Sequence, residues 1–234
     1  MDSSQHTVRS FDEDLAHVDR LIREMSDLAG AMVEAATGSL IASDDALAQR
    51  VVADDKAMDA RQRALDESAI ALIARRQPVA QDLRAVVGAI RMAADLERIG
   101  DLAKNIAKRV AAVGEGGMPR NLAHSIEAMS KLVLEQIRGA VDAYVARDAA
   151  GLERLRDRDE DIDIKYTSVF RELLTYMMED PRNITACTHL LFCAKNLERI
   201  GDHVTNIAEN AYYVVTGALL PLARPKRDET TPAA

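Results

Sequence analysis

The chain has 234 residues, of which 48% are hydrophobic and 29% charged, so it can form a packed core and is too apolar for a disordered chain. Aromatic residues make up only 3%, with no Trp, which argues against a base-stacking nucleic-acid surface. The formal net charge is −8, from 30 Lys and Arg against 38 Asp and Glu. Because so acidic a surface repels phosphate backbones and anionic lipid, the composition predicts no nucleic-acid binding and favours a cation or another protein as the partner.

No segment of the sequence is typical of a signal peptide or a membrane span. The N-terminus lacks an apolar stretch after a basic start, and the longest apolar run, near residues 211–223, is broken by Gly217 and Pro221. Cys187 and Cys193 form no metal or redox motif and are expected to be reduced core residues. These features predict a cytoplasmic protein without membrane insertion.

Helical periodicity extends over residues 11–217, and nothing alternates as a strand does. Ser10 with Glu13 forms a capping-box pattern, which predicts that a first helix begins there and runs toward Ile41. Ser43 and the two aspartates after it predict the cap of a second helix that ends near Arg76.

Pro78 stands where a first-turn proline belongs and predicts a third helix that reaches Val113. The glycine-rich stretch 114–119 follows and is the one clear boundary of the chain. Three further helices are predicted at residues 120–147, from the Asp148 cap to Met178, and from the Asp180 cap and Pro181 to Gly217.

An internal repeat relates the two sets of three helices. LERIGDLAKNIA at residues 96–107 and LERIGDHVTNIA at residues 197–208 differ at only three positions, and each lies in the third helix of its set. The sequence therefore predicts an all-α fold of six helices, arranged as two tandem three-helix bundles. The predicted limits are residues 1–113 and 120–217 for the bundles, 114–119 for the linker and 218–234 for a disordered tail.

Each third helix carries a ridge of side-chain oxygens on a face away from its apolar seam. Glu97, Asp101 and Asn105 stand at every fourth position. The second copy of the ridge is Glu198, Asp202 and Asn206. An isolated E-x-x-x-D pair is most often a solvated acidic face, and like charges one turn apart repel by about 0.2–0.5 kcal/mol.

The neighbouring helices strengthen the case for a site. Asp55 and Asp159 occupy positions of their helices where the seam is otherwise apolar, and each is followed one turn later by another aspartate. A seam carboxylate is costly unless it is paired or bound to a cation. The pattern predicts four carboxylates in each half, forming an oxygen site for Mg, Mn, Ca or oxidised iron that could hold more than one ion. The eight acids are Asp55, Asp59, Glu97, Asp101, Asp159, Asp163, Glu198 and Asp202.

Several alternatives stay open at this point. Arg98 and Arg199 could neutralise the acids in ordinary salt bridges. The five histidines show no paired ligand spacing, which argues against zinc. Gly100 and Gly201 weaken their helices, which predicts close approach of a neighbouring helix or access for a ligand.

Three segments resemble the PhoU family of phosphate-signalling regulators. They are RQPVAQDLRAVVGAIRMAADLERIGDLAKNIA at residues 76–107, SFDEDL at residues 10–15 and LERIGDHVTNIAEN at residues 197–210. The likeness covers nearly the whole chain, although TACTHLLFCAKN at residues 185–196 departs from the pattern that precedes the first motif.

The resemblance implies two pseudo-twofold-related three-helix bundles, often in a homodimer, with multinuclear clusters of iron, manganese or magnesium at the eight acids. It also implies a cytoplasmic negative regulator of the phosphate-starvation response. Such a protein would act between the ATPase of the phosphate ABC transporter and a PhoR-type sensor histidine kinase.

Two other hypotheses belong to different classes. A ferritin-type iron store or metal enzyme would need Glu-x-x-His on inward faces, and that motif is absent. A metal-free helical scaffold with acidic faces would be distinguished by metal analysis of the purified protein. Because no nucleophile, phosphate loop or acid–base pair forms a catalytic motif, we expect no enzymatic activity.

Overall fold

The structure, a computed structural model, describes residues 3–114 and 118–220 of the chain. Within these ranges every regular element is helical, which confirms the predicted all-α class. Most of the predicted disordered tail and the middle of the predicted linker lie outside the described residues.

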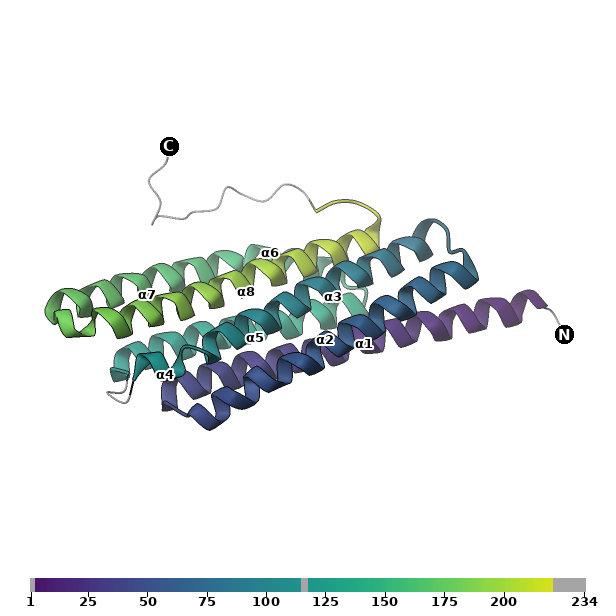
Figure 1. Ribbon diagram of the computed structural model, residues 1–234. Helices are drawn as coiled ribbons and strands as arrows, with labels where there is room; N and C mark the ends of the chain where they lie inside the picture. Colours follow the sequence, from purple (N-terminus) through teal and green to yellow (C-terminus); the bar gives the residue numbers. More distant parts are fainter. Residues whose placement is uncertain (1–2, 115–117, 221–234) are drawn as a thin grey trace.

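The elements fall into two sets along the chain (Figure 1). The first set comprises α1 (Ser3–Ala42), α2 (Asp45–Arg76), α3 (Ala80–Ala107) and the short α4 (Val110–Val113). The second comprises α5 (Arg120–Val145), α6 (Ala149–Asp157), α7 (Asp159–Glu179), the 3-10 turn η1 (Pro181–Asn183) and α8 (Ile184–Thr216).

Local capping explains several of these ends. The Asp44 carboxylate accepts a hydrogen bond from the Leu47 amide at 2.9 Å and caps α2. Asp148 caps α6 in the same way, and Asp180 caps η1. Gly217 ends α8 in a left-handed conformation with φ of 76°. These ends lie at or within a few residues of the predicted positions.

Three boundaries were predicted wrongly. The first helix already begins at Ser3, so Ser10 lies inside it and not at its cap; no Gly or Pro in the first ten residues interrupts it. Pro78 precedes the third helix, whose N-cap is the extended residue Val79. The third helix stops at Ala107, and a turn separates it from α4.

The predicted fifth helix is also interrupted, at Arg158 between α6 and α7. The carbonyl of Arg158 accepts a hydrogen bond from Nε2 of Gln136, a buried residue of α5, at 2.9 Å. A side chain that bonds a helix carbonyl from outside offers it an alternative partner, which accounts for the break.

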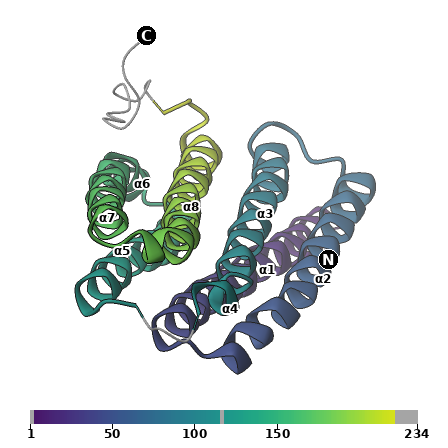
Figure 2. The ribbon, with the colours of Figure 1, turned by 60° about the vertical axis from the view of Figure 1, so that its left-hand side comes forward.

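The two sets form three-helix units that lie side by side in an elongated molecule (Figure 2). The units meet through α3 against α8 and α1 against α5, while α2 and the α6–α7 pair lie on the outer sides. At the first of these contacts Gly88 of α3 packs directly on Val214 of α8, and a Cβ atom there would clash. The buried core is continuous across both units.

The apolar seams of α3 and α8 lie in the core along both motifs. Leu96, Ile99, Ala103 and Ile106 of α3 are at most 1% exposed, as are their counterparts Leu197, Ile200, Val204 and Ile207 of α8. Cys187 and Cys193 are buried and free, and burial raises the pKa of the Cys193 thiol to about 12. Among the described residues no helix is long and apolar enough to cross a membrane. The domain limits proposed from the sequence stay a prediction.

Candidate functional site

The first acidic cluster lies where α2 packs against α3. Its members, all half-buried, are Asp55, Asp59, Glu97 and Asp101. A Cβ atom at Gly100 would lie 3.3 Å from Cγ of Met58, which is closer than most side-chain contacts allow. The missing side chain therefore lets α2 approach α3, which is the first of the two reasons predicted for this glycine.

Lys104, one turn after Asp101 on α3, supplies a positive charge to this cluster. Its Nζ donates to Oδ1 of Asp101 at 2.6 Å and to Oδ2 of Asp55 at 2.8 Å, so one ammonium bridges the two helices. Burial disfavours the ammonium, but the hydrogen bonds and charges of the two aspartates outweigh burial and raise the pKa of Lys104 to about 12. Lys104 is therefore charged at neutral pH.

Glu97 has a raised pKa, first because it is partly buried and then because other acids of the cluster lie near it. Burial raises the pKa of Glu97, and the carboxylates of Asp101 and Asp59 raise it further. Arg98 lowers that pKa only in part, since its Nε lies 3.8 Å from Oε2 of Glu97 and its side chain is 63% exposed. The first cluster thus retains an excess of negative charge that a cation would relieve.

The second acidic cluster repeats this arrangement where α7 packs against α8. Its members, half-buried apart from the buried Glu198, are Asp159, Asp163, Glu198 and Asp202. A Cβ atom at Gly201 would lie 2.9 Å from Cδ1 of Ile162 and 3.5 Å from Oδ1 of Asp159. The glycine therefore admits the first aspartate of α7 to the acidic face of α8.

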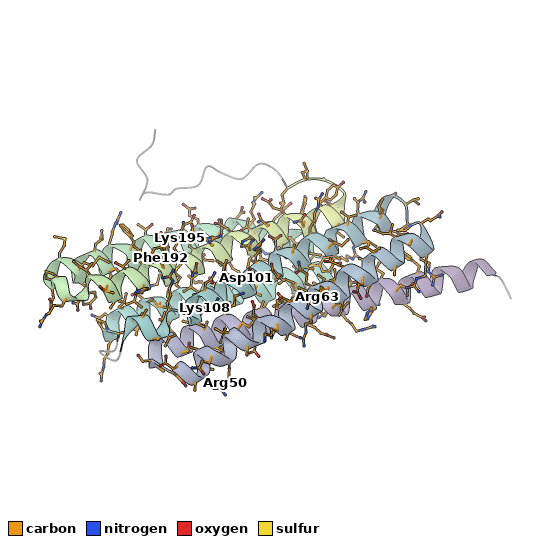
Figure 3. The ribbon with its side chains drawn as sticks, in the orientation of Figure 1. Arg50, Arg63, Asp101, Lys108, Phe192 and Lys195 are labelled. Carbon is orange, nitrogen blue, oxygen red and sulfur yellow. The ribbon has the colours of Figure 1, made fainter. Side chains whose placement is uncertain are left out.

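Lys195 is the lysine of the second cluster, and it approaches from the other end of the motif. Its Nζ donates to Oε1 of Glu198 at 2.7 Å along α8 and lies 5.1 Å from the ring centroid of Tyr166. Burial opposes its charge, but the hydrogen bond and charge of Glu198, with smaller contributions from Tyr166 and Asp202, raise the pKa of Lys195. Figure 3 shows Asp101 on α3 and Lys195 on α8.

The structure places the predicted acids on two pairs of packed helices and keeps one predicted basic partner, since Nη1 of Arg98 lies 3.4 Å from Oδ2 of Asp101. The sequence singled out Arg98 and Arg199, both of which are exposed, and missed Lys104 and Lys195. A basic residue three positions from an acid on a helix is the signal that would have found both lysines. Asn105 lies exposed on α3.

The two units are also joined by polar contacts that the sequence did not predict. Nδ1 of His203 donates to Oδ1 of Asp95 at 2.9 Å, and Nδ2 of Asn206 approaches the same oxygen at 3.4 Å. Asp95 immediately precedes the first LERIGD motif, whereas His203 and Asn206 belong to the second copy. The two helices that carry the motifs, α3 and α8, are therefore linked through one carboxylate.

The donor chemistry of both clusters suits a hard cation, because carboxylate oxygens are the ligands that Mg, Mn and Fe(III) prefer. Across the described parts of the chain, however, no three His, Cys, Asp or Glu side chains are arranged to hold a metal ion. In the first cluster the nitrogen of Lys104 lies between two of the carboxylates that would do so. The residues fit a cation, but their present arrangement would have to close around it.

Comparison with known proteins shows the same architecture elsewhere. The family profile for the PhoU domain matches the chain twice, at residues 22–110 and 126–211. The crystal structure of PhoU from Pseudomonas aeruginosa superimposes with a TM-score of 0.84 at 36% identity and covers 89% of this chain and 100% of its own. The crystal structure of the phosphate transport system regulatory protein PhoU from Streptococcus pneumoniae superimposes with a TM-score of 0.83 at 28% identity. The match covers 91% of this chain and 100% of that chain.

Curated relatives match over almost their whole length. The phosphate-specific transport system accessory protein PhoU homolog of Rhizobium meliloti is 55% identical over 229 residues, which is 98% of this chain and 97% of the relative. The homolog of Caulobacter vibrioides is 47% identical over 225 residues, which is 96% of this chain and 98% of the relative. With two matches to the domain profile and relatives this similar over their full length, the chain belongs to the PhoU family.

Proposed function

We propose that this protein is an accessory protein of a phosphate transport system and a negative regulator of the phosphate-starvation response. In this role it couples the ATPase of the phosphate ABC transporter to a PhoR-type sensor histidine kinase, without enzymatic activity of its own. The observation that carries the proposal is the 55% identity, over 98% of the chain, to a phosphate-specific transport system accessory protein.

The regulatory proposal is tested by deleting the protein and growing the cells in high phosphate. We expect phosphate-starvation genes to be derepressed and phosphate uptake to rise. Unchanged reporter output together with unchanged uptake would contradict the proposal. A pull-down from phosphate-replete cells tests the partners directly and should recover the transporter ATPase and the sensor kinase.

We further propose that the two acidic clusters bind iron, manganese or magnesium. The support is that two packed helices in each unit carry two of the acids each, and that the carboxylates of Asp101 and Asp59 add to burial in raising the pKa of Glu97. A bound ion would neutralise carboxylates on both helices and so would stabilise their packing. Metal content per chain after mild purification, compared with chelated protein, tests this part of the proposal.

The place of action and the assembly belong to the same proposal. We expect the protein to work in the cytoplasm and to form a homodimer, as the family resemblance implies. Cell fractionation tests the first expectation. Light scattering of the purified protein coupled to size-exclusion chromatography tests the second, and a single monomer peak at micromolar concentration would contradict it.

A metal-free helical scaffold is the second candidate for the acidic faces. The observation in its favour is that Lys104 and Lys195 already donate to acids of both clusters. If the purified protein holds no metal and its thermal unfolding is indifferent to Mn²⁺ and to chelator, the scaffold interpretation replaces metal binding. The regulatory proposal does not depend on this outcome.

A further inference from the structure

Lys104 occupies a bridging position within the first acidic cluster. Its nitrogen lies within 2.8 Å of oxygens on both α2 and α3, and its side chain is only 18% exposed. An ammonium group has three donors and no acceptor, so two of its protons are directed at the two aspartates. A hard metal ion that joined the same two carboxylates would need the space that this nitrogen fills, because metal–oxygen distances of about 2.0–2.6 Å are shorter still.

The second cluster lacks a lysine in the equivalent position. In the aligned motifs LERIGDLAKNIA and LERIGDHVTNIA, Lys104 corresponds to Thr205. Lys195, for its part, corresponds to Ala94 and precedes the motif. Lys195 donates a hydrogen bond to Glu198 on its own helix and contacts the Tyr166 ring of α7, and its side chain is 44% exposed.

We propose that Lys104 is a tethered cation that fills the first cluster, so that a metal ion enters there only by displacing it. A tethered charge costs no translational entropy to hold in place, whereas an ion must be recruited from solution. The first unit is thereby joined across α2 and α3 at all metal concentrations. The displacement of Lys104 by a metal ion is the metal half of this inference, and it rests on the metal binding proposed above. The bridging of α2 and α3 by Lys104 is the structural half, and it does not.

Thermal unfolding in the presence of chelator tests the structural half on the full chain. Lys104→Met keeps the length of the side chain and removes the charge, and we expect a melting temperature about 3–6 °C below wild type. Lys131→Met is the matched control, since Lys131 pairs with Glu127 at the same short distance of 2.7 Å but is 66% exposed. We expect the control to shift by less than about 1 °C.

A second substitution distinguishes lost charge pairing from poor folding. Asp55→Asn in the Lys104→Met background removes the carboxylate left without its cation, so we expect part of the lost melting temperature to return. The same change in wild type should lower the melting temperature. Equal melting of wild type, Lys104→Met and Lys131→Met, or additive effects of the two substitutions, would overturn the structural half.

Equilibrium dialysis against Mn²⁺ tests the metal half. Lys104→Met should bind Mn²⁺ at the first cluster with a Kd lower by about tenfold or more, because a unit charge a few ångströms from the ion is removed. Adding Asp101→Asn should abolish the gain. The converse variant, Thr205→Lys, should weaken binding at the second cluster.

The possible outcomes separate this inference from the proposed function. If wild type and Lys104→Met bind Mn²⁺ equally, and Asp101→Asn reduces binding in both, the acids hold metal and the inference is overturned. If no variant binds Mn²⁺, metal binding fails as a proposal and the displacement by metal fails with it. The melting experiments then decide whether Lys104 is the resident cation of a metal-free cluster.

Discussion

The two acidic clusters share the way their helices pack and differ in how the charge of their carboxylates is balanced. In both, a glycine between the Glu and the Asp of the motif lets the neighbouring helix approach, with Gly100 facing Met58 and Gly201 facing Ile162. In the first, Lys104 hydrogen-bonds acids of two helices, whereas in the second Lys195 donates to an acid of its own helix and contacts the neighbouring helix through the Tyr166 ring. Duplication thus preserved the helix contact, which depends on shape, and left the counter-charge free to move to another position.

The contact between the units offers the largest expected effect. Gly88→Ala places a Cβ atom where Cγ2 of Val214 lies, and the valine cannot rotate away cheaply because its χ1 is restricted. We expect the free energy of unfolding to fall by about 1–3 kcal/mol, as for other overpacked cores. Urea unfolding followed by circular dichroism measures it.

Gly30→Ala is the matched control for Gly88→Ala. A Cβ atom at Gly30 would meet only Cδ2 of Leu134 at 3.9 Å, which is ordinary contact. Since alanine is favoured over glycine inside a helix, this variant should be more stable by about 0.5–1 kcal/mol. If both variants lose stability equally, close packing of α3 on α8 is not the cause.

Metal binding should distinguish the two clusters next most strongly. Asp202→Asn should weaken Mn²⁺ binding at the second cluster by about tenfold or more, because it removes a ligand charge there. Asp101→Asn should leave that site almost unchanged. Dialysis with metal analysis of both variants measures the difference, and a loss of Mn²⁺ from the second cluster in Asp101→Asn would contradict two separate sites.

The polar link between the units, from Asp95 to His203 and Asn206, should have a smaller effect than the Gly88 contact or the metal ligands. Asp95→Ala removes the acceptor of His203 and Asn206, and we expect a loss of about 1–2 kcal/mol in the free energy of unfolding. Glu209→Ala, an exposed acid of α8, should change it by less than about 0.5 kcal/mol. Indistinguishable unfolding curves would mean that the link carries no net energy.

Substitution of Glu97 should give the smallest effect on the free energy of unfolding. Unlike most substitutions, it should stabilise the protein. Because the folded state raises the pKa of Glu97 above 4.5, ionising it costs stability at neutral pH, and that cost is relieved as the pH falls toward 4.5. In chelator, Glu97→Gln should therefore be more stable than wild type by about 0.2–0.5 kcal/mol at pH 7. The advantage should vanish in unfolding measured near pH 4, and a pH-independent difference would contradict this origin.

The sequence predicted features that depend on neighbours along the chain. Caps such as Asp148 and Asp180 bond to amides two or three residues away, so their signal is local. The seam aspartates and the two motif glycines were also visible, because helical periodicity fixes which face each residue occupies. Shape and periodicity together sufficed for the fold, and the role of the eight acids as a site stays a prediction.

Features that depend on contacts between distant segments were not predictable in this way. The partner of Lys104 on α2 is 49 positions away, and Asp95 lies 108 positions from His203. The break at Arg158 likewise depends on Gln136 of another helix. Periodicity indicates which face of a helix is buried but not which residue of a neighbour meets it.

The central position of α3 and α8 has a consequence for the history of the chain. A protein with a single copy of the three-helix unit would expose the faces of α1 and α3 that now cover α5 and α8, and it would have to pair with a second molecule to bury them. In such a pair every substitution appears twice, and pairing weakens on dilution. Fusion into one polypeptide removes the dilution and lets equivalent positions diverge, so that one copy can carry Lys104 while the other carries Thr205.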